Sequence, residues 1–392
     1  MRRAIGTRET ALVQAAPLGY ASLMIFVSSL LLLASAQATA AATPLPSEIH
    51  NFKDWVVTCD NVMRCEATSL VPELTAEEQE EASRVVGTPA EATRQDPWDR
   101  FGALNLQREG GANAPLVISL GDFERGTPAR IVVGEAQLAA RLTAGELGEW
   151  RVEPEDRNSF FDALYGGTLI VQDANGATVT EIALDGLWEA LVYMDERQGR
   201  LGTPTAVVRR GRRPASSVPN PPALPIVQAA PRPSDRPLAI SAARMMQARR
   251  EMGCTQDEVG AVASGEAPTH ALGNGRTLIM MACGAGAYNY QAIPLIASQD
   301  GRNIRIVPAP FDVYREPSEG EPDPKGYYVT NAEFDEATLA IGEYAKGRGI
   351  GDCGVAARYV WDGQAFRLIE QREMSECRGS REMLTTWRAE VR

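Results

Sequence analysis

Residues suited to acid–base or nucleophilic catalysis are scarce in this chain. Its 392 residues include two histidines. His50 follows the expected cleavage point of an export signal by a few residues, and His270 lies in EAPTHALGNG, a stretch typical of a loop. A serine or cysteine nucleophile needs a base within hydrogen-bonding reach, so a histidine-dependent mechanism would have to use His270. We expect an exposed loop histidine there and assign no catalytic residue.

The motifs of common hydrolases and nucleotide-binding proteins do not occur: there is no G-x-S-x-G, H-E-x-x-H or G-x-x-x-x-G-K-[ST]. One segment, KGRGIGDCG, does contain G-x-G-x-x-G between Gly349 and Gly354. In a dinucleotide-binding fold these glycines follow a parallel strand and begin a helix, whereas the run that follows here, VAARYVW, is typical of a strand. We therefore expect no nucleotide and no other cofactor.

Two glycine-containing segments are the candidate binding loops. In KGRGIGDCG, Lys346 and Arg348 lie among glycines whose amides could bind an anion, and Asp352 belongs to the same loop. In CGAGAYNY, Tyr288 and Asn289 could form a binding turn with an aromatic contact surface. In chain order CGAGAYNY is the first loop and KGRGIGDCG is the second. The alternative interpretation is structural, with tyrosines packed along a strand in the first loop and tight turns beside a disulfide in the second.

Six cysteines form three couples that are close in sequence: Cys59 with Cys65, Cys254 with Cys283, and Cys353 with Cys377. An even number of cysteines in an exported protein indicates disulfides, and sequential pairing is the simplest of the 15 possible connectivities. A metal site would need other ligands, but no C-x2-C occurs and His270 cannot complete a Cys2His2 set. The acidic loop REPSEGEPDPKG also lacks the spacing of a calcium loop. We expect no bound metal.

Residues 1–40 are predicted to be a signal peptide for Sec export. Arg2, Arg3 and Arg8 precede an apolar stretch from Leu18 to Ala36, and the small residues after it offer cleavage sites near positions 38–41. An uncleaved membrane anchor is the alternative, because about 19 apolar residues can just span a bilayer. We expect a periplasmic or secreted protein with no membrane span after cleavage.

The charge of the chain is strongly acidic. Thirty-nine basic residues against 51 acidic ones give a net charge of −12, and removal of the signal peptide, which carries +2, makes it −14. A surface this acidic repels phosphate backbones. We therefore expect no nucleic acid among the partners, and cationic partners are favoured.

A proline-rich segment at residues 214–237, with eight prolines in 24 residues, is predicted to be a linker. Because proline lacks an amide donor, we expect an extended spacer that forms neither a helix nor a ladder. It separates an amino-terminal domain at residues 44–213 from a carboxy-terminal domain at residues 238–392. A ligand for a proline-recognition domain is the alternative.

The amino-terminal domain is predicted to mix strands with two helices. Runs of strand type are KDWVVTC, MRCEAT, LNLQ, PLVISL, ARIVVG, TLIVQ and VTEIAL. A turn centred on Val62 places Cys59 opposite Cys65. Capping-box spacing predicts a helix over 75–86. Leu187, Leu191 and Met194 predict another, started by Asp185 and ended by Gly199.

The carboxy-terminal domain is predicted to be mainly β after a helix from Ser241 to Met252. TLIMMAC and YQAIPLI have strand length, and RYVWDGQAFRLIEQ predicts a hairpin with a two-residue turn at Asp362 and Gly363. In that register Cys353 and Cys377 are not opposed, so their bond needs a bulge or irregular chain beyond the ladder. The expected fold class is α+β, with two disulfide-stabilised domains of mainly antiparallel β structure and a few short helices.

Several of these segments together resemble a known family. NFKDWVVTCDNVMRCEA, CGAGAYN, KGRGIGDCG, WDGQAFRL, ECRG and TTWRAEV occur in the order found in exported bacterial proteins grouped as the domain of unknown function 1176 family. The resemblance covers about residues 50 to 392, except that the acidic segment 73–95 resembles an insertion. The amino-terminal half also resembles, more weakly, the invasion-associated locus B proteins. The resemblance implies an envelope location and carries no activity or catalytic residues.

These observations favour a soluble periplasmic protein that acts as a non-catalytic binding or envelope-support module. Its partner would be an envelope protein or polymer. Two alternatives stay open: a hydrolase that attacks an envelope polymer through carboxylates, and an inhibitor of a basic enzyme. A cleft with two facing, desolvated carboxylates would favour the hydrolase, and an exposed aromatic patch would favour binding.

Overall fold

The fold is described from a computed structural model. The described residues are 43–73, 75, 77, 100–121, 126–134, 136–138, 140–145, 149–164, 168–254, 267–313, 326–380 and 382–392. The expected signal peptide, nearly all of the expected helix at 75–86, and most of the acidic loop after Tyr314 lie outside these residues.

The amino-terminal half is built around a seven-stranded antiparallel sheet in the order β1-β2-β3-β4-β5-β9-β8. Its strands are β1 (His50–Phe52), β2 (Trp55–Cys59), β3 (Cys65–Ser69), β4 (Ala103–Arg108), β5 (Val117–Gly121), β8 (Leu142–Ala144) and β9 (Trp150–Val152). Every residue of β2 is buried, because the strand is central and covered on both faces. Cys59 lies opposite Cys65 in the β2–β3 ladder, so the expected hairpin is confirmed.

A second antiparallel sheet, in the order β11-β10-β6-β7, completes this half with two α-helices. Its elements are β6 (Arg130–Val133), β7 (Ala136–Leu138), β10 (Thr168–Gln172), β11 (Thr178–Ala183), α2 (Arg157–Ala163) and α3 (Leu187–Arg197), with a 3₁₀ turn at Pro154–Asp156. Leu187, Leu191 and Met194 of α3 are buried in one apolar core with residues of both sheets, as their helical spacing predicts.

The start of α3 differs from the expectation. Asp185 does not cap the helix; its carboxylate accepts a hydrogen bond from Lys53 Nζ at 2.9 Å. Gly186 occupies the cap position with φ of 98°, and a Cβ there would overlap the carbonyl oxygen of Phe52. The chain therefore enters α3 through a close backbone contact that requires glycine. Gly199, also with positive φ, follows the end of the helix as expected.

The proline-rich segment pairs with the carboxyl terminus, which corrects the expectation that it forms no ladder. It contains a 3₁₀ turn at Ala215–Ser217 and β12 (Ile226–Val227), which pairs in parallel with β23 (Glu390–Val391). Glu390 N donates to Pro225 O at 2.8 Å, and Ala229 N donates to Arg392 O at 2.8 Å. The pairing is possible because residues between the prolines keep their donors, while proline carbonyls still accept.

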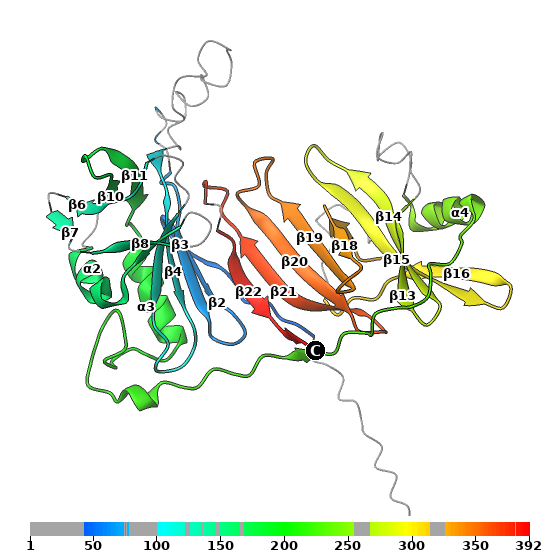
Figure 1. Ribbon diagram of the computed structural model, residues 1–392, viewed down its shortest axis with the longest axis horizontal. Coiled ribbons are helices and arrows are strands. Elements are labelled where there is room, and N and C mark those ends of the chain that lie inside the picture. The colour runs from blue at the N-terminus through cyan, green and yellow to red at the C-terminus, as the bar shows by residue number, and fades with distance from the viewer. Residues whose placement is uncertain are drawn as a thin grey trace, which may run out of the picture. The chain divides into compact units, whose positions relative to one another are not determined.

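The carboxy-terminal half begins with α4 and one antiparallel sheet, seen together in Figure 1. The elements are α4 (Ala242–Met252), β13 (Thr269–Gly273), β14 (Arg276–Ala285), β15 (Tyr290–Asp300), β16 (Asn303–Pro308) and β17 (Val329–Thr330), which pairs with β15. Ser241 caps α4 by accepting from Arg244 N. Ala248 packs on Ile279, Met281 and Leu295 of the sheet, so α4 covers one of its faces.

His270 lies in a strand, and the expectation of an exposed loop histidine was wrong. The strand β13 pairs with β14 because Asn274 and Gly275, both with positive φ, form a two-residue turn between them. A ring nitrogen of His270 lies 2.7 Å from Glu336 Oε1, and the ring packs on Phe334.

A five-stranded antiparallel sheet follows in the order β18-β19-β20-β21-β22 (Figure 1). Its strands are β18 (Glu333–Asp335), β19 (Ala340–Lys346), β20 (Gly354–Trp361), β21 (Phe366–Met374) and β22 (Leu384–Arg388). Ile341, Tyr359 and Phe366 pack against Leu278 and Met280 of β14. One face of this sheet is therefore covered by the preceding sheet, and alternation along the strands leaves the other face outward.

The β20–β21 turn has four residues rather than the expected two, because Trp361 pairs with Phe366. Asp362 Oδ1 accepts from Gln364 N at 2.6 Å and Ala365 N at 2.7 Å, which closes the longer turn. The register then shifts by a bulge between Arg358 and Tyr359. The bulge and the irregular chain beyond β21 together bring the last two cysteines within bonding distance.

The six cysteines form the three expected disulfides, Cys59–Cys65, Cys254–Cys283 and Cys353–Cys377. The described residues are thus mostly antiparallel β sheet with three short α-helices and three disulfides, which confirms the coarser part of the expected fold class. Residues Thr43–Arg392 group as one compact unit. The division into domains at residues 44–213 and 238–392 therefore stays a proposal.

Candidate functional site

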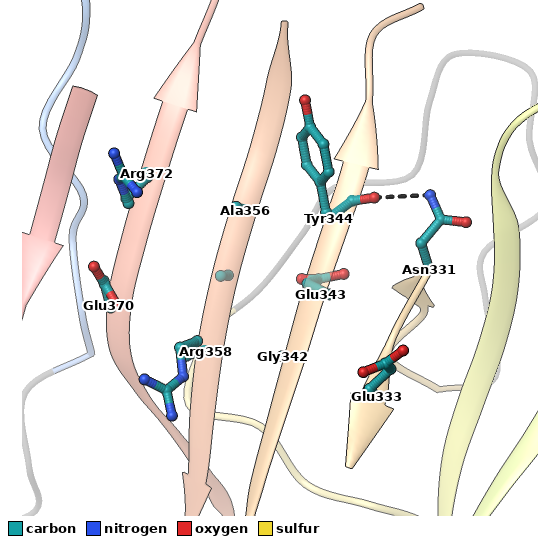
Figure 2. Close-up of a pocket in the computed structure, with 10 residues that line it drawn as sticks. Asn331, Glu333, Gly342, Glu343, Tyr344, Ala356, Arg358, Glu370 and Arg372 are labelled. Carbon is teal, nitrogen blue, oxygen red and sulfur yellow. Dashed lines mark hydrogen bonds between the residues drawn. The ribbon is translucent and has the colours of Figure 1, made fainter. Parts of the chain in front are cut away.

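The outward face of the β18–β22 sheet forms a groove of about 380 Å³. Six residues share this face because their strands pair in register, Gly342 with Arg358 and Glu370, and Tyr344 with Ala356 and Arg372. The small residues Gly342 and Ala356 lie between larger charged ones, so the middle of the face is hollow. Figure 2 shows Glu333 and Arg358 on strands on either side of Gly342.

The groove carries charges of both signs. Arg358 lies directly opposite Glu370 in the β20–β21 ladder, and Glu333 lies opposite Gly342 in the β18–β19 ladder. Arg372 donates to Met383 O at 3.0 Å, which holds its guanidinium at the end of the groove. Such a surface suits a ligand that presents both acidic and basic groups, such as a polypeptide segment.

Glu343 is the most buried carboxylate at the groove, and both of its oxygens are used. Oε2 accepts from Thr330 N at 2.9 Å, and Oε1 accepts from the Tyr359 hydroxyl at 3.0 Å. The Tyr327 and Tyr359 hydroxyls lie 2.7 Å apart. Glu343 therefore fastens β17 to the sheet, a structural role that explains why a carboxylate is tolerated in a buried position.

Asn331 joins the groove to the first candidate binding loop. Its Nδ2 donates to Tyr344 O at 2.9 Å, a bond drawn in Figure 2, and to Asn289 Oδ1 at 2.8 Å. Its Oδ1 accepts from Tyr290 N at 2.9 Å. One amide side chain thus fixes the tip of the β14–β15 hairpin beside the sheet that forms the groove.

The five residues proposed for the binding loops come together in space, but two bonded pairs show structural roles. Asn289 Nδ2 donates to Lys346 O at 2.9 Å, and Lys346 N donates to Asn289 Oδ1 at 3.2 Å. The Tyr288 hydroxyl donates to Gly347 O at 3.1 Å. The two loops are therefore bonded to each other through backbone groups.

Arg348 and Asp352 form a two-point ion pair within the second loop. Arg348 Nε donates to Asp352 Oδ1 at 2.7 Å, Arg348 Nη2 donates to Oδ2, and Gly379 N donates to Oδ2 at 2.8 Å. Desolvation alone would raise the pKa of Asp352, but hydrogen bonds from Arg348 and Gly379 outweigh it and hold the pKa below its usual value. Asp352 is thus occupied as a structural anion and does not face an open site.

Three apolar side chains stay exposed where these two loops meet. The exposed fractions are 38% for Tyr288, 51% for Tyr290 and 76% for Ile350. A Cβ on Gly349 would lie 3.6 Å from the Tyr288 ring, which places the two loops in contact at this edge. We call Tyr288, Tyr290 and Ile350 the apolar rim. It adjoins the groove through Asn331 and through Tyr344, whose hydroxyl donates to Gly351 O at 2.7 Å.

The groove itself was missed at the sequence level. The signal was present only in part: Arg358 of β20 lies between the buried Ala357 and Tyr359, whereas Glu370 and Arg372 of β21 alternate with half-buried residues. Their position on one face depends on the register, which the four-residue turn and the bulge shift from the one expected. In the described part of the chain, no three His, Cys, Asp or Glu side chains group as metal ligands would. No helix in that part is long and apolar enough to cross a membrane.

The fold and the groove define a disulfide-linked protein of antiparallel β sheets with a charged surface groove. The chain belongs to the family described as "Protein of unknown function (DUF1176)", whose family model matches residues 49–390. It is similar to "Uncharacterized protein YpfG" of Escherichia coli (strain K12), with 29% identity over 354 residues, which is 83% of this chain and 88% of that protein. No solved structure matches. The weaker resemblance of the amino-terminal half to the invasion-associated locus B proteins gains no support from these comparisons.

Proposed function

We propose that this protein is an exported periplasmic binding module that holds a segment of an envelope protein in the β18–β22 groove. The observation that carries the proposal is the position of the apolar rim beside a groove charged with both signs. Exposed aromatic and aliphatic side chains next to polar ones are typical of protein interfaces. The three disulfides support an oxidising compartment, in agreement with the signal expected at residues 1–40.

The bonds behind the rim favour binding by a preformed surface. Asn289 and Asn331 fix the two loops through side chain to backbone hydrogen bonds, and Cys353–Cys377 closes the second loop. A surface that is already ordered loses little conformational entropy when a partner binds. Hydrolysis through carboxylates has less support, because the buried carboxylate at the groove, Glu343, already accepts from Thr330 N and Tyr359.

Filling the groove tests the proposal. A Cβ built on Gly342 has no atom within 4 Å, so Gly342→Leu should fold while its side chain occupies the hollow. We expect affinity capture from periplasmic extract to recover the same partner with the unchanged protein and with Gly342→Ala. Affinity for the partner, and with it recovery, should fall roughly tenfold with Gly342→Leu, which corresponds to a loss of about 1.4 kcal/mol of contact energy.

A second pair of variants tests the apolar rim. Ile350→Ser should weaken capture of that partner, whereas Leu45→Ser, which changes an equally exposed aliphatic side chain outside the groove, should not. Equal recovery of partners by Gly342→Leu and the unchanged protein would exclude the groove as the binding surface. Release of soluble fragments from isolated envelope polymer by the purified protein would instead support the hydrolase.

A further inference from the structure

A second cavity, of about 350 Å³, lies in the amino-terminal half and is lined by arginines. The four are Arg108, Arg157, Arg200 and Arg210. The other lining residues are 112–116, Pro154, Asn158, Phe161 and 204–207. They are polar or apolar, and no acidic residue of the described chain is among those that line the cavity. This concentration of positive charge is unexpected in a chain with a net charge of −12.

Two of the arginines are buried with a single carboxylate between them. The exposed fractions are 2% for Arg108, 1% for Arg200 and 0% for Asp195. Asp195 Oδ1 accepts from Arg108 Nη2 at 2.6 Å, while its Oδ2 accepts from Val207 N and Val208 N. Two guanidinium charges thus face one carboxylate, and one positive charge at the bottom of the cavity has no counter-charge among the described residues.

The surplus charge is visible in the pKa of Arg200, which is lowered to about 10. Burial is the main cause, and repulsion from Arg108 adds to it, against attraction by Asp195. A buried charge without a partner is costly. An anion in the cavity would supply the missing counter-charge, so the site is electrostatically prepared for one.

The arginines differ in whether their guanidinium N–H groups are already used in hydrogen bonds within the protein. Arg200 is committed to backbone, because it donates to the carbonyls of Gly111, Ala112, Ala114 and Thr205 and thereby shapes the walls. Its Nε donates to Gln198 Oε1 at 3.1 Å. It therefore contributes its charge rather than new hydrogen bonds.

Arg157 and Arg210 lie at the rim of the cavity with donors available. The Arg157 side chain makes no hydrogen bond or ion pair with any residue that the structure describes, and its acidic neighbours Glu155 and Asp156 bind Arg141 instead. Arg210 donates to Ala206 O at 3.2 Å and to Asn158 Oδ1 at 3.0 Å, which leaves Nη1 without a described acceptor. Both guanidiniums can therefore bind a ligand oxygen.

We infer that this cavity binds a phosphoryl anion, either inorganic phosphate or a small phosphomonoester. Planar guanidiniums pair with tetrahedral oxyanions through two parallel hydrogen bonds. Several guanidiniums around one cavity favour a dianion over a monoanion, and the volume leaves room beside Phe161 and Leu116 for a small organic body. This inference is independent of the proposed function, because the cavity and the groove share no residue.

Calorimetric titration of the purified mature protein at low ionic strength tests the inference. The probes are inorganic phosphate, glycerol 3-phosphate and succinate. The variants are Arg157→Ala and Arg210→Ala, with Arg197→Ala as the control, since Arg197 is an exposed arginine of the same half outside the cavity. Thermal unfolding without ligand verifies that each variant folds.

We expect phosphate or glycerol 3-phosphate to bind the unchanged protein and Arg197→Ala alike, and each cavity variant roughly tenfold more weakly, as for the loss of one charged hydrogen bond. Added salt should weaken binding. Tighter binding of glycerol 3-phosphate identifies a monoester ligand, and equal affinity identifies phosphate itself; both support the inference. No binding, equal affinity for succinate, or unchanged affinity in both cavity variants would overturn it.

Discussion

The carboxylate of Asp352 joins the two chain segments that the adjacent Cys353–Cys377 disulfide also links. It accepts from Arg348 within its own loop and from Gly379 N beyond Cys377, and it is almost fully buried. Asp352→Asn should lower the free energy of unfolding at pH 7 by about 2 kcal/mol. This value lies in the lower part of the range for hydrogen bonds to a charged group, because the Arg348 side chain is partly exposed to solvent.

The pH dependence of this effect has a definite sign. The folded pKa of Asp352 is lowered, so its stabilisation is complete above the unfolded pKa of about 3.9 and is lost as the pH falls through the folded pKa. Urea unfolding at pH 7 and at pH 3 should therefore show a gap between Asp352→Asn and the unchanged protein that narrows in acid. Asp300→Asn, a change of an exposed residue at the end of β15, is the control. If the difference in unfolding free energy were the same at both pH values, the destabilisation would come from packing rather than from the charge of Asp352.

At the candidate site, the residue types predicted where an unusual surface lies better than they predicted what each side chain does there. The glycines, Asn289 and the tyrosines of the two loops indicated a special surface, and the structure does bring the loops together. The sequence cannot show whether an amide or carboxylate side chain is bonded to backbone groups elsewhere in the protein, because those groups are far away in the chain. Asn289 and Lys346 are 57 positions apart. Arg157 and Arg210 gave no signal at all, since only the folded chain brings them to one cavity.

Among the elements, α4 depends most clearly on a disulfide. The helix ends at Met252, two residues before Cys254, and Cys254–Cys283 ties that end to β14. On the chain-entropy model stabilisation increases with loop length, and the cysteines are 29 positions apart here but 6 apart in Cys59–Cys65. Replacing Cys254 and Cys283 by serine should therefore cost about 1.4 kcal/mol more than replacing Cys59 and Cys65.

Urea unfolding of the two double variants measures this difference. The comparison is matched, because all four cysteines are buried. Loss of helical circular dichroism should precede loss of the β signal in the Cys254/Cys283 variant alone. Equal destabilisation of the two variants would show that packing at the bonds, rather than loop length, sets their contribution.

Elements with a local signal were predictable, and those set by distant pairing were not. The helices at 187–197 and 242–252 and the Cys59–Cys65 hairpin follow from residue patterns that extend over a few positions, although the expected cap at Asp185 was wrong. The predicted length of the turn at Asp362 was wrong, because hydrogen bonds from the backbone to the Asp362 side chain stabilise a four-residue turn instead of the two-residue turn. The β12–β23 pair joins residues 164 positions apart, and proline content gave no indication of it.

At the scale of the whole molecule, the amino-terminal and carboxy-terminal halves contact each other through a small apolar cluster and several polar contacts. Val56 and Leu70 pack with Met374 and Leu384. Arg378 donates to Val71 O at 2.9 Å and to Lys53 O at 2.8 Å, and its guanidinium also pairs with Asp54. These contacts span more than 300 positions of sequence, so the sequence pattern indicated only the linker and not the interface.

The contacts predict that the halves stay together when the linker is cut. A protease site inserted after Pro222, in an exposed part of the proline-rich segment, should yield two fragments that co-elute in gel filtration. Arg378→Ala removes hydrogen bonds to two backbone carbonyls and an ion pair. The dissociation constant of the two fragments should therefore rise roughly tenfold or more, so that the cleaved variant separates at protein concentrations at which the unchanged fragments stay together. Arg372→Ala, whose bonds stay within the carboxy-terminal half, should leave the cleaved complex intact. Fragments that separate at once without any substitution would establish independent domains joined by a tether.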